Sequence, residues 1–422
     1  MRNRNGRLRI AAAIMLLLLA GCGRQSIIDK DSAVEKLDGG DRVDITFWHT
    51  YSDEETRILE DTIIPGFEKE YPGIRVNAVR QTNNAELKYT LISKATANRG
   101  PDVMRMDIAW VPEFAQNGLL LPLGDNAGFE EVTAQLQSNT GSAGYFEGAH
   151  YSLPVNMNTK VAIYNKALLE KLGLDRPPST LQEVLELARE HRYRIGLSGL
   201  EAWKSLPYIY ALGGRMTNDT YTKASGYLNG EATVNAVEEL LSLYRDGLID
   251  RSLINGGGDI WGGVKSGDIL VTDDGPWFYS VFQGEELQKA IRSTVAVPFP
   301  SSNGPSSVLG GEDLVSVKGS ARPREAWEFM KWMIRTDSQV AMSQTGLIPT
   351  NLEAKEIKAK DDSFIPPFAE ALNHTFLRPP VKQWSSIDAV YTANMIRIFQ
   401  GEISVKDGLS EAASEIDKLL ER

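Results

Sequence analysis

Apolar and polar residues alternate along the chain with two periods, and these periods predict where strands and helices lie. The segment 43–48 reads Val-Asp-Ile-Thr-Phe-Trp, which alternates and is rich in β-forming residues, so it predicts a strand. Strands that alternate with helices predict an α/β fold on a mostly parallel sheet, with helices on both faces. The elements predicted in the first part are strands at 43–48, 74–79 and 102–106, and helices at 53–71, kinked at Pro65, and at 85–97.

The middle and the last part of the chain continue this alternation. Pro323 is predicted to be the first residue of a helix whose apolar side chains share one face. Trp327 and Trp332 lie in that helix and are expected to belong to the core. The other predicted elements are strands at 160–164, 269–272 and 294–297, and helices at 166–172, 180–191 and 232–246.

The N-terminal segment has the features of a lipoprotein signal. A basic start precedes an unbroken apolar run over 10–20, which is shorter than the roughly 20 residues needed to span a bilayer and is typical of a secretory signal. The run ends in Leu19-Ala20-Gly21-Cys22, which resembles a bacterial lipobox, in which the cysteine is acylated. An ordinary signal peptide with an incidental cysteine is the alternative, but the chain has no other cysteine. We expect a signal peptide over 1–21, a lipid anchor on Cys22 and a polar tether over 22–42, at the extracytoplasmic face of the cell membrane.

Chain length and net charge limit the number of domains and the kinds of partner that are expected. A chain of 422 residues exceeds the size at which a single core stops growing, so two domains are expected. The formal net charge of −11 argues against a nucleic-acid partner, which requires a basic face. A single cysteine excludes an intrachain disulfide.

The chain carries no familiar catalytic or cofactor motif. It has no G-x-S-x-G, H-E-x-x-H, P-loop or G-x-G-x-x-G sequence, and its four histidines lack metal-ligand spacing. The adjacent pairs Asp273-Asp274 and Glu312-Asp313 are the candidates for glycosidase carboxylates, but neighbouring residues on a strand face opposite sides. We expect no catalytic residue, no metal site and no cofactor, with a secreted carbohydrate-active enzyme as the alternative.

Five sequence blocks occur in order over residues 43–350. They are Ile45 to His49 with Phe67 to Ile74, Pro101-Asp102-Val103 with Trp110 to Phe114 and Gly118 to Leu123, Leu153 to Thr159 with Tyr164-Asn165-Lys166, Gly275-Pro276-Trp277, and Gly310-Gly311 with Ala326 to Phe329 and Gly346 to Pro349. Behind a lipobox, these blocks together resemble the extracellular solute-binding proteins of ABC importers, among them the maltose-, trehalose/maltose- and glycerol-3-phosphate-binding proteins.

The resemblance implies a two-lobed periplasmic-binding-protein-like fold of type II, with lobes joined by crossover strands near 155–160, 295–299 and 346–352. Ligand is then expected between the lobes, at the carboxyl ends of the strands. The implied function is that of a monomeric substrate-binding lipoprotein that captures a carbohydrate and delivers it to an ABC permease. The implied lobes are 43–155 plus 299–346 for the N-terminal lobe, and 156–298 plus 347–422 for the C-terminal lobe.

A sugar presents hydroxyl groups around its rim and C–H patches on its faces, so its site needs aromatic plates beside paired polar groups. Trp277 follows Gly-Pro at a predicted strand end, where the family places its stacking aromatic. Asn158 lies where relatives that bind disaccharides often carry Asp, which keeps a hydrogen-bonding fork and removes a charge. The expected ligand-binding residues are Trp48, His49, Tyr51, Asp107, Trp110, Asn156, Asn158, Glu201, Trp203, Trp277, Gly311, Glu312 and Trp384.

Several alternatives remain open at this point. His49 and Asp107 could each cap the helix that follows, and Glu312 could be solvated. Three arginines, at positions 80, 105 and 378, are candidates to hold a phosphate or carboxylate, but none lies on a strong motif. A neutral oligosaccharide is therefore the predicted ligand, with a polyol, a glycerol phosphodiester or a uronate oligosaccharide as alternatives. Presenting bound sugar to a signalling receptor is an alternative to import.

Overall fold

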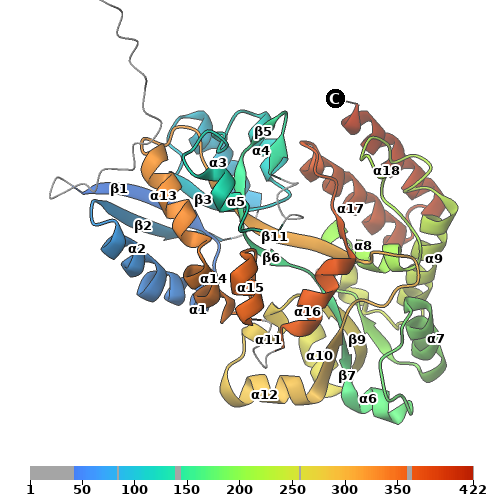
Figure 1. Ribbon diagram of the computed structural model, residues 1–422. Coiled ribbons are helices and arrows are strands. Elements are labelled where there is room, and N and C mark those ends of the chain that lie inside the picture. The colour runs from blue at the N-terminus through green and yellow to red at the C-terminus, as the bar shows by residue number, and fades with distance from the viewer. Residues whose placement is uncertain (1–41, 83–84, 138–143, 256–257, 359–363, 422) are drawn as a thin grey trace, which may run out of the picture.

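The computed structural model describes residues 42–82, 85–137, 144–255, 258–358 and 364–421, which form two α/β lobes (Figure 1). The predicted signal peptide, Cys22 and the tether up to residue 41 lie outside the described residues. Within these described ranges, no helix is both long and apolar enough to cross a membrane.

The first lobe is built on a seven-stranded sheet with the order β12-β6-β11-β3-β1-β2, in which β13 also pairs with β11. Both faces of this sheet are covered: Phe47 packs with Phe67 and Phe329, whereas the next residue, Trp48, packs with Leu91 on the opposite side. The strands are β1 (Val43–His49), β2 (Ile74–Arg80), β3 (Val103–Asp107), β6 (Ser152–Asn158), β11 (Ser307–Ser316), β12 (Ile348–Pro349) and β13 (Thr375–Leu377). The helices of this lobe are α1 (Asp53–Ile58), α2 (Ile64–Glu70), α3 (Ala85–Thr96), α4 (Val111–Gln116), α5 (Phe129–Thr133), α13 (Pro323–Met333), α14 (Thr336–Ser343) and α15 (Leu352–Lys358), with a hairpin of β4 (Tyr145–Phe146) and β5 (Ala149–His150).

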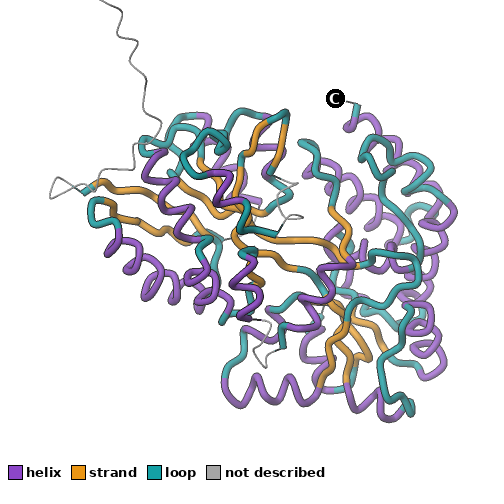
Figure 2. The backbone as a smooth tube through the Cα atoms, in the orientation of Figure 1, coloured by secondary structure: helices purple, strands orange, loops and turns teal. Residues whose placement is uncertain are grey.

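The second lobe is built on a four-stranded sheet with the order β10-β7-β9-β8. Its largest core joins this sheet to a layer of helices in which α17 and α18 pack beside α8 and α9 (Figures 1 and 2). The strands are β7 (Val161–Asn165), β8 (Arg194–Gly196), β9 (Ile269–Asp274) and β10 (Thr294–Val297). The helices are α6 (Lys166–Lys171), α7 (Leu181–His191), α8 (Ala202–Ala211), α9 (Glu231–Arg245), α10 (Ile260–Ser266), α11 (Trp277–Ser280), α12 (Gly284–Ser293), α16 (Pro366–Ala371), α17 (Trp384–Gln400) and α18 (Val405–Leu420), with short 3₁₀ turns at η2 (Arg251–Asn255) and η3 (Leu372–His374).

Two long strands join the lobes and change the sheet from the predicted pattern. The chain leaves the first sheet after Asn158 and returns at Ser307; it leaves again after Pro349, and β13 then pairs with β11. Because β6 runs out of the first lobe and β11 runs back into it, the two pair antiparallel. The prediction of a mostly parallel sheet is therefore wrong: β1 pairs parallel with β2 and β3, but β11 pairs antiparallel with both β3 and β6.

The first predicted helix is interrupted where proline was expected to kink it. Ser52 and Glu55 form a capping box at its start, so the helix begins as the acidic residues 53–55 predict. The stretch Leu59–Ile63 is a π-helical turn, and Pro65 lies at the start of α2 directly after it. A wider turn before Pro65 accommodates a residue that has no N–H to donate to the preceding turn.

The helix from Pro323 follows the prediction. It runs from Pro323 to Met333, and both of its tryptophans are buried, Trp327 at 3% and Trp332 at 8% exposure. Their indole N–H groups donate to backbone carbonyl oxygens of Ala127 and Ile63. These two tryptophans are confirmed as core residues.

Candidate ligand-binding site

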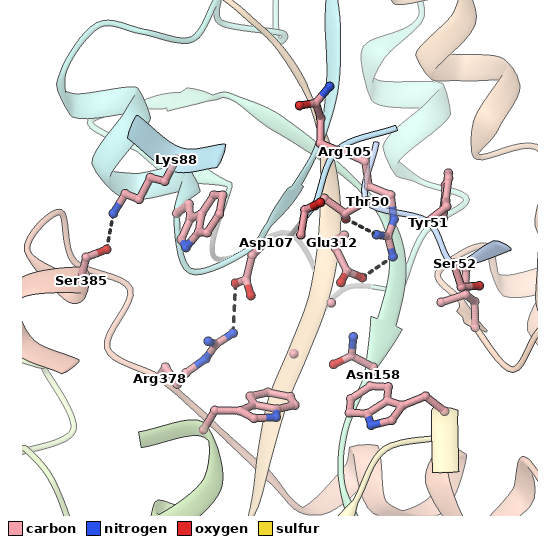
Figure 3. A pocket seen from close by; sticks show the side chains of 18 of the residues that line it. Thr50, Tyr51, Ser52, Lys88, Arg105, Asp107, Asn158, Glu312, Arg378 and Ser385 are labelled. Carbon is pink, nitrogen blue, oxygen red and sulfur yellow. Dashed lines mark hydrogen bonds and ion pairs between the residues drawn. The ribbon is translucent and has the colours of Figure 1, made fainter. Parts of the chain in front are cut away.

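A large cavity of about 1510 Å³ lies between the lobes. The first lobe contributes the loop after β1, the end of β3, helix α3 and the strand β11. The second lobe contributes the first turns of α8, α11 and α17 (Figure 3). The volume exceeds the roughly 300–1,000 Å³ of pockets that hold drug-sized ligands, so a larger ligand fits.

Two tryptophans of the second lobe form one wall of the cavity. The rings of Trp203 and Trp277 are both half-buried, with centroids 6.4 Å apart and planes inclined by 32°. A Cβ at Gly275 would lie 2.3 Å from the Trp277 ring, and a Cβ at Gly310 would lie 2.6 Å from the Trp203 ring. Glycine at these positions therefore lets each indole lie directly against backbone, which leaves aromatic surface free toward the cavity.

A buried ion pair lies on the first-lobe side of the cavity. Arg105 is 4% exposed, and its Nη2 lies 2.7 Å from Glu312 Oε2. Arg105 also donates to Thr50 Oγ1 at 2.9 Å, and its guanidinium carbon lies 4.4 Å from the centre of the Tyr51 ring. Burial raises the pKa of Glu312, and the neighbouring Arg105 charge opposes that shift. The pair presents a donor group and an acceptor group side by side at the cavity surface.

A second ion pair links the end of β3 in the first lobe to the segment between β13 and the second-lobe helix α17. Arg378 follows β13, and its Nη2 lies 3.1 Å from Oδ1 of Asp107 at the end of β3 (Figure 3). The Arg378 guanidinium carbon also lies 5.0 Å from the centre of the Trp203 ring. Asp107 accepts from the amide of Ala109 at 2.8 Å, and helix α4 has Trp110 at its N-cap position without a side-chain cap. Asp107 therefore faces Arg378 instead of capping α4.

A third polar contact crosses between the lobes beside the second. Lys88 of α3 is paired with Glu113 of α4, and its ammonium also donates to Ser385 Oγ of α17 (Figure 3). Ser385 Oγ donates in turn to Glu113 Oε2 at 3.1 Å. The Lys88 ammonium lies 5.9 Å from the centre of the Trp110 ring. Trp110 thus lies in the cavity beside this bridge.

The cations that line the cavity are paired with carboxylates. Among the residues that the structure describes, each lining arginine or lysine has a carboxylate partner: Arg80 with Asp53, Lys88 with Glu113, Arg105 with Glu312 and Arg378 with Asp107. No group of three or more metal-ligating side chains is present in the described part of the chain. Within this described lining, the site therefore offers aromatic faces, hydrogen-bonding pairs and the further carboxylates of Glu55 and Asp388, but no unpaired cation.

Most of the predicted ligand-binding residues line this one cavity. They come from both lobes and from segments far apart in the sequence, which the fold brings together. These are Tyr51, Asp107, Trp110, Asn158, Glu201, Trp203, Trp277, Gly311, Glu312 and Trp384.

Three predicted residues lie outside the cavity lining. Trp48 is 9% exposed and packs under α3, and His49 is fully buried between the rings of Phe47 and Tyr51, because β1 continues through both. Burial and the nearby Arg105 charge lower the pKa of His49 to about 4.

Asn156, the third, is 3% exposed and donates to Glu312 while accepting from Arg105, so it supports the ion pair from behind. The alternative that His49 caps the helix after β1 is wrong as well, because the side chain that caps α1 is that of Ser52.

Several lining residues were not expected from the sequence. Thr50, Lys88, Tyr89 and Ser385 lie on no motif, and only the fold brings α3 and α17 to the same space. The three arginines at 80, 105 and 378, weighed as partners for an anion, all line the cavity. Their carboxylate partners could not be assigned from sequence, since Asp107 and Arg378 are 271 positions apart.

Comparisons with known proteins agree with this architecture. A family model described as bacterial extracellular solute-binding protein matches residues 62–367. A binding protein of Brucella abortus is 23% identical over 365 residues, covering 84% of this chain and 88% of that protein. The maltotriose-binding protein of Pyrococcus abyssi is 21% identical over 346 residues, covering 79% of this chain and 73% of that protein.

Solved structures share the fold. The GacH receptor of Streptomyces glaucescens, studied without ligand and with acarbose, is 25% identical, with a TM-score of 0.78 over 90% of this chain and 98% of that one. An ABC transporter solute-binding protein of Thermotoga lettingae, bound with α-D-tagatose, is 24% identical, with a TM-score of 0.75 over 89% of this chain and 99% of that one. The two-lobed fold is thus that of binding proteins rather than enzymes, and the chain belongs to the family of bacterial extracellular solute-binding proteins.

Proposed function

We propose that this protein is the carbohydrate receptor of an ABC importer, and that it holds a neutral oligosaccharide in the cavity between its lobes. The observation that carries the proposal is the pair of half-buried indoles, Trp203 and Trp277, which face the polar pairs of the opposite lobe. Stacking on the indoles removes C–H surface of a sugar ring from water, while paired donors and acceptors select the hydroxyl pattern.

The pairing of charges favours a neutral ligand. A phosphate or carboxylate would have to draw a guanidinium away from its carboxylate, and Arg105 and Glu312 are both largely buried. Removing one partner of a buried ion pair typically costs about 3–5 kcal/mol. A sugar hydroxyl can donate to Glu312 and accept from Arg105 without breaking the pair.

The size of the cavity favours more than one sugar ring. Its volume of about 1510 Å³ leaves room beyond a single pyranose. Among the relatives, one is named for maltotriose and another has been studied with acarbose. We take an oligosaccharide as the ligand class on these grounds.

The cavity is divided between the lobes, so ligand binding and lobe closure are coupled. A ligand that contacts Trp203 in one lobe and Glu312 in the other stabilises the closed arrangement only through contacts to both. The closed form would then dock on the permease. Lipid on Cys22 would hold the binding protein near the membrane for this step. This chain needs no nucleotide for that step.

A screen of neutral and anionic ligands tests the proposal. Purified protein is examined by thermal shift with mono- and oligosaccharides, polyols, a glycerol phosphodiester and a uronate oligosaccharide, and each stabilising compound is then titrated calorimetrically. We expect a neutral oligosaccharide to bind, and Trp277→Ala to lose about thirtyfold in affinity, since an anchor aromatic contributes about 2 kcal/mol. Trp327→Ala serves as the control: the Trp327 ring is buried outside the cavity lining, so this substitution should affect stability only. Binding restricted to the anionic compounds would contradict the proposal.

A further inference from the structure

Helix α8 carries Trp203 in its first turn, and a proline interrupts the hydrogen bonding of that helix. In an α-helix, the carbonyl of one residue accepts from the amide four residues later, so Trp203 O would pair with residue 207. Residue 207 is proline, which lies inside α8 and has no N–H. The carbonyl of the residue that bears the indole therefore lacks its helical donor.

The side chain of Lys160 supplies a donor in its place. Lys160 Nζ donates to Trp203 O at 3.2 Å and lies 5.7 Å from the centre of the Trp203 ring. Lys160 is 2% exposed, and its ammonium is paired with Asp273, which is itself buried. Asp273 also accepts from the hydroxyl of Tyr208 at 2.9 Å. Because Tyr208 directly follows Pro207, this network holds α8 on both sides of the missing hydrogen bond.

Lys160 also lies where the chain passes between the lobes. Only Thr159 and Lys160 separate β6 of the first sheet from β7 of the second. The amide of Lys160 donates to Ser307 Oγ at 3.2 Å, and its carbonyl accepts from that same hydroxyl. Ser307 is the first residue of β11, the other strand that joins the lobes. One residue thus touches both joining segments and the backbone of an aromatic plate.

We propose that Lys160 is a positioning residue for ligand binding, which replaces the amide that Pro207 lacks and fixes the Trp203 plate relative to the joining strands. The inference rests on the proposed function, because it concerns the placement of one wall of the proposed carbohydrate site. Lysine is almost never fully buried without a partner, and a buried ion pair adds little net stability compared with apolar packing. We therefore expect the Lys160–Asp273 pair to fix the positions of the groups that it binds rather than to add stability.

The test replaces the ion pair without leaving a buried charge. In Lys160→Met/Asp273→Asn both charges are removed at similar side-chain volume. Protein labelled with 5-fluorotryptophan is studied by ¹⁹F NMR without ligand, and the Trp203 resonance is assigned from its loss in Trp203→Phe. We expect this resonance to shift and broaden in the double variant. Adding Pro207→Ala restores an amide donor for Trp203 O, and we expect the resonance to return toward its original position and width.

Affinity for maltotriose, measured by calorimetry, is the second readout. We expect the double variant to lose about tenfold or more, or ~1.4 kcal/mol, and the triple variant to recover most of that loss. Ile416→Ala, a change in the buried face of α18 in the same lobe, is the matched control that lowers stability without moving the Trp203 resonance.

An unchanged Trp203 resonance in the double variant, or a failure of Pro207→Ala to restore it, would overturn the positioning role. If the resonance moves and is restored while the unaltered protein does not bind maltotriose, the positioning role stands and the proposed ligand is what must be revised.

Discussion

Replacing Gly310 with alanine should disable one wall of the site with little effect on the rest of the fold. A Cβ at this position would lie 2.2 Å from Asn158 Oδ1 and 2.6 and 2.8 Å from two atoms of the Trp203 ring. Carbon atoms in contact normally lie about 3.5–4.0 Å apart, so the indole would have to move by about 1 Å. The φ angle of Gly310 is not in the left-handed region, and alanine therefore adds a steric effect without backbone strain.

The magnitude follows from the role of the displaced ring. Overpacking of this kind costs about 1–3 kcal/mol, part of which is relieved because Trp203 is half-buried and can swing toward the cavity. A ring that is displaced into the ligand space no longer stacks on a sugar, and loss of an aromatic anchor is worth about 2 kcal/mol. The dissociation constant of Gly310→Ala should therefore rise about thirtyfold.

Calorimetric titration with the best ligand from the sugar screen measures this change. Gly124→Ala is the matched control, since a Cβ there meets nothing within 4 Å and its backbone is also outside the left-handed region. Equal affinity of the two alanine variants would show that Trp203 does not contact the ligand, and would refute the placement of this wall.

Three further predictions concern the anchor, the lobe contacts and the core. Cys22→Ser should abolish lipid attachment, seen by mass spectrometry of membrane fractions, while sugar binding persists; an unmodified thiol at Cys22 in membrane-bound protein would contradict the lipobox. Arg378→Gln removes the ion pair with Asp107 and should weaken sugar binding about fivefold, roughly 1 kcal/mol, with a larger radius of gyration by X-ray scattering, whereas unchanged values would show that this pair does not hold the lobes together. Burial, joined by the charges of Glu312 and Asp107, raises the pKa of Asp313 to about 7. Folding therefore loses stability as pH rises from about 4 to about 7, and Asp313→Asn should raise the melting temperature at pH 8 more than at pH 5; an equal effect at both pH values would contradict this sign.

The fold and several residues that line the cavity could be predicted from the sequence, because these leave a local signature. Trp277 follows a Gly-Pro turn at a strand end, and Gly310-Gly311 marks a place where only backbone fits against Trp203 and Asn156. The alternation of 43–48 likewise identifies a strand, and the adjacent apolar residues Phe47 and Trp48 are buried on its two faces.

The exact lining of the cavity and the ion pairs could not be predicted. They depend on where strands end and on contacts between segments far apart in the sequence. Trp48 and His49 were expected in the ligand loop, but β1 continues through His49, so the loop that lines the cavity begins at Thr50. The partners of Arg378 and Lys160 lie more than a hundred positions away, and no single sequence assigns such pairs. The arginines were therefore visible as cations but not as members of ion pairs.

A crystal structure with the tightest-binding neutral oligosaccharide would locate the ligand among these side chains. We predict sugar rings against Trp203 and Trp277 in the cavity between the lobes, with hydroxyl groups bound by Glu312 and by the Asp107–Arg378 pair. A sugar bound elsewhere, or an anion bound by arginines that have left their carboxylates, would contradict this prediction.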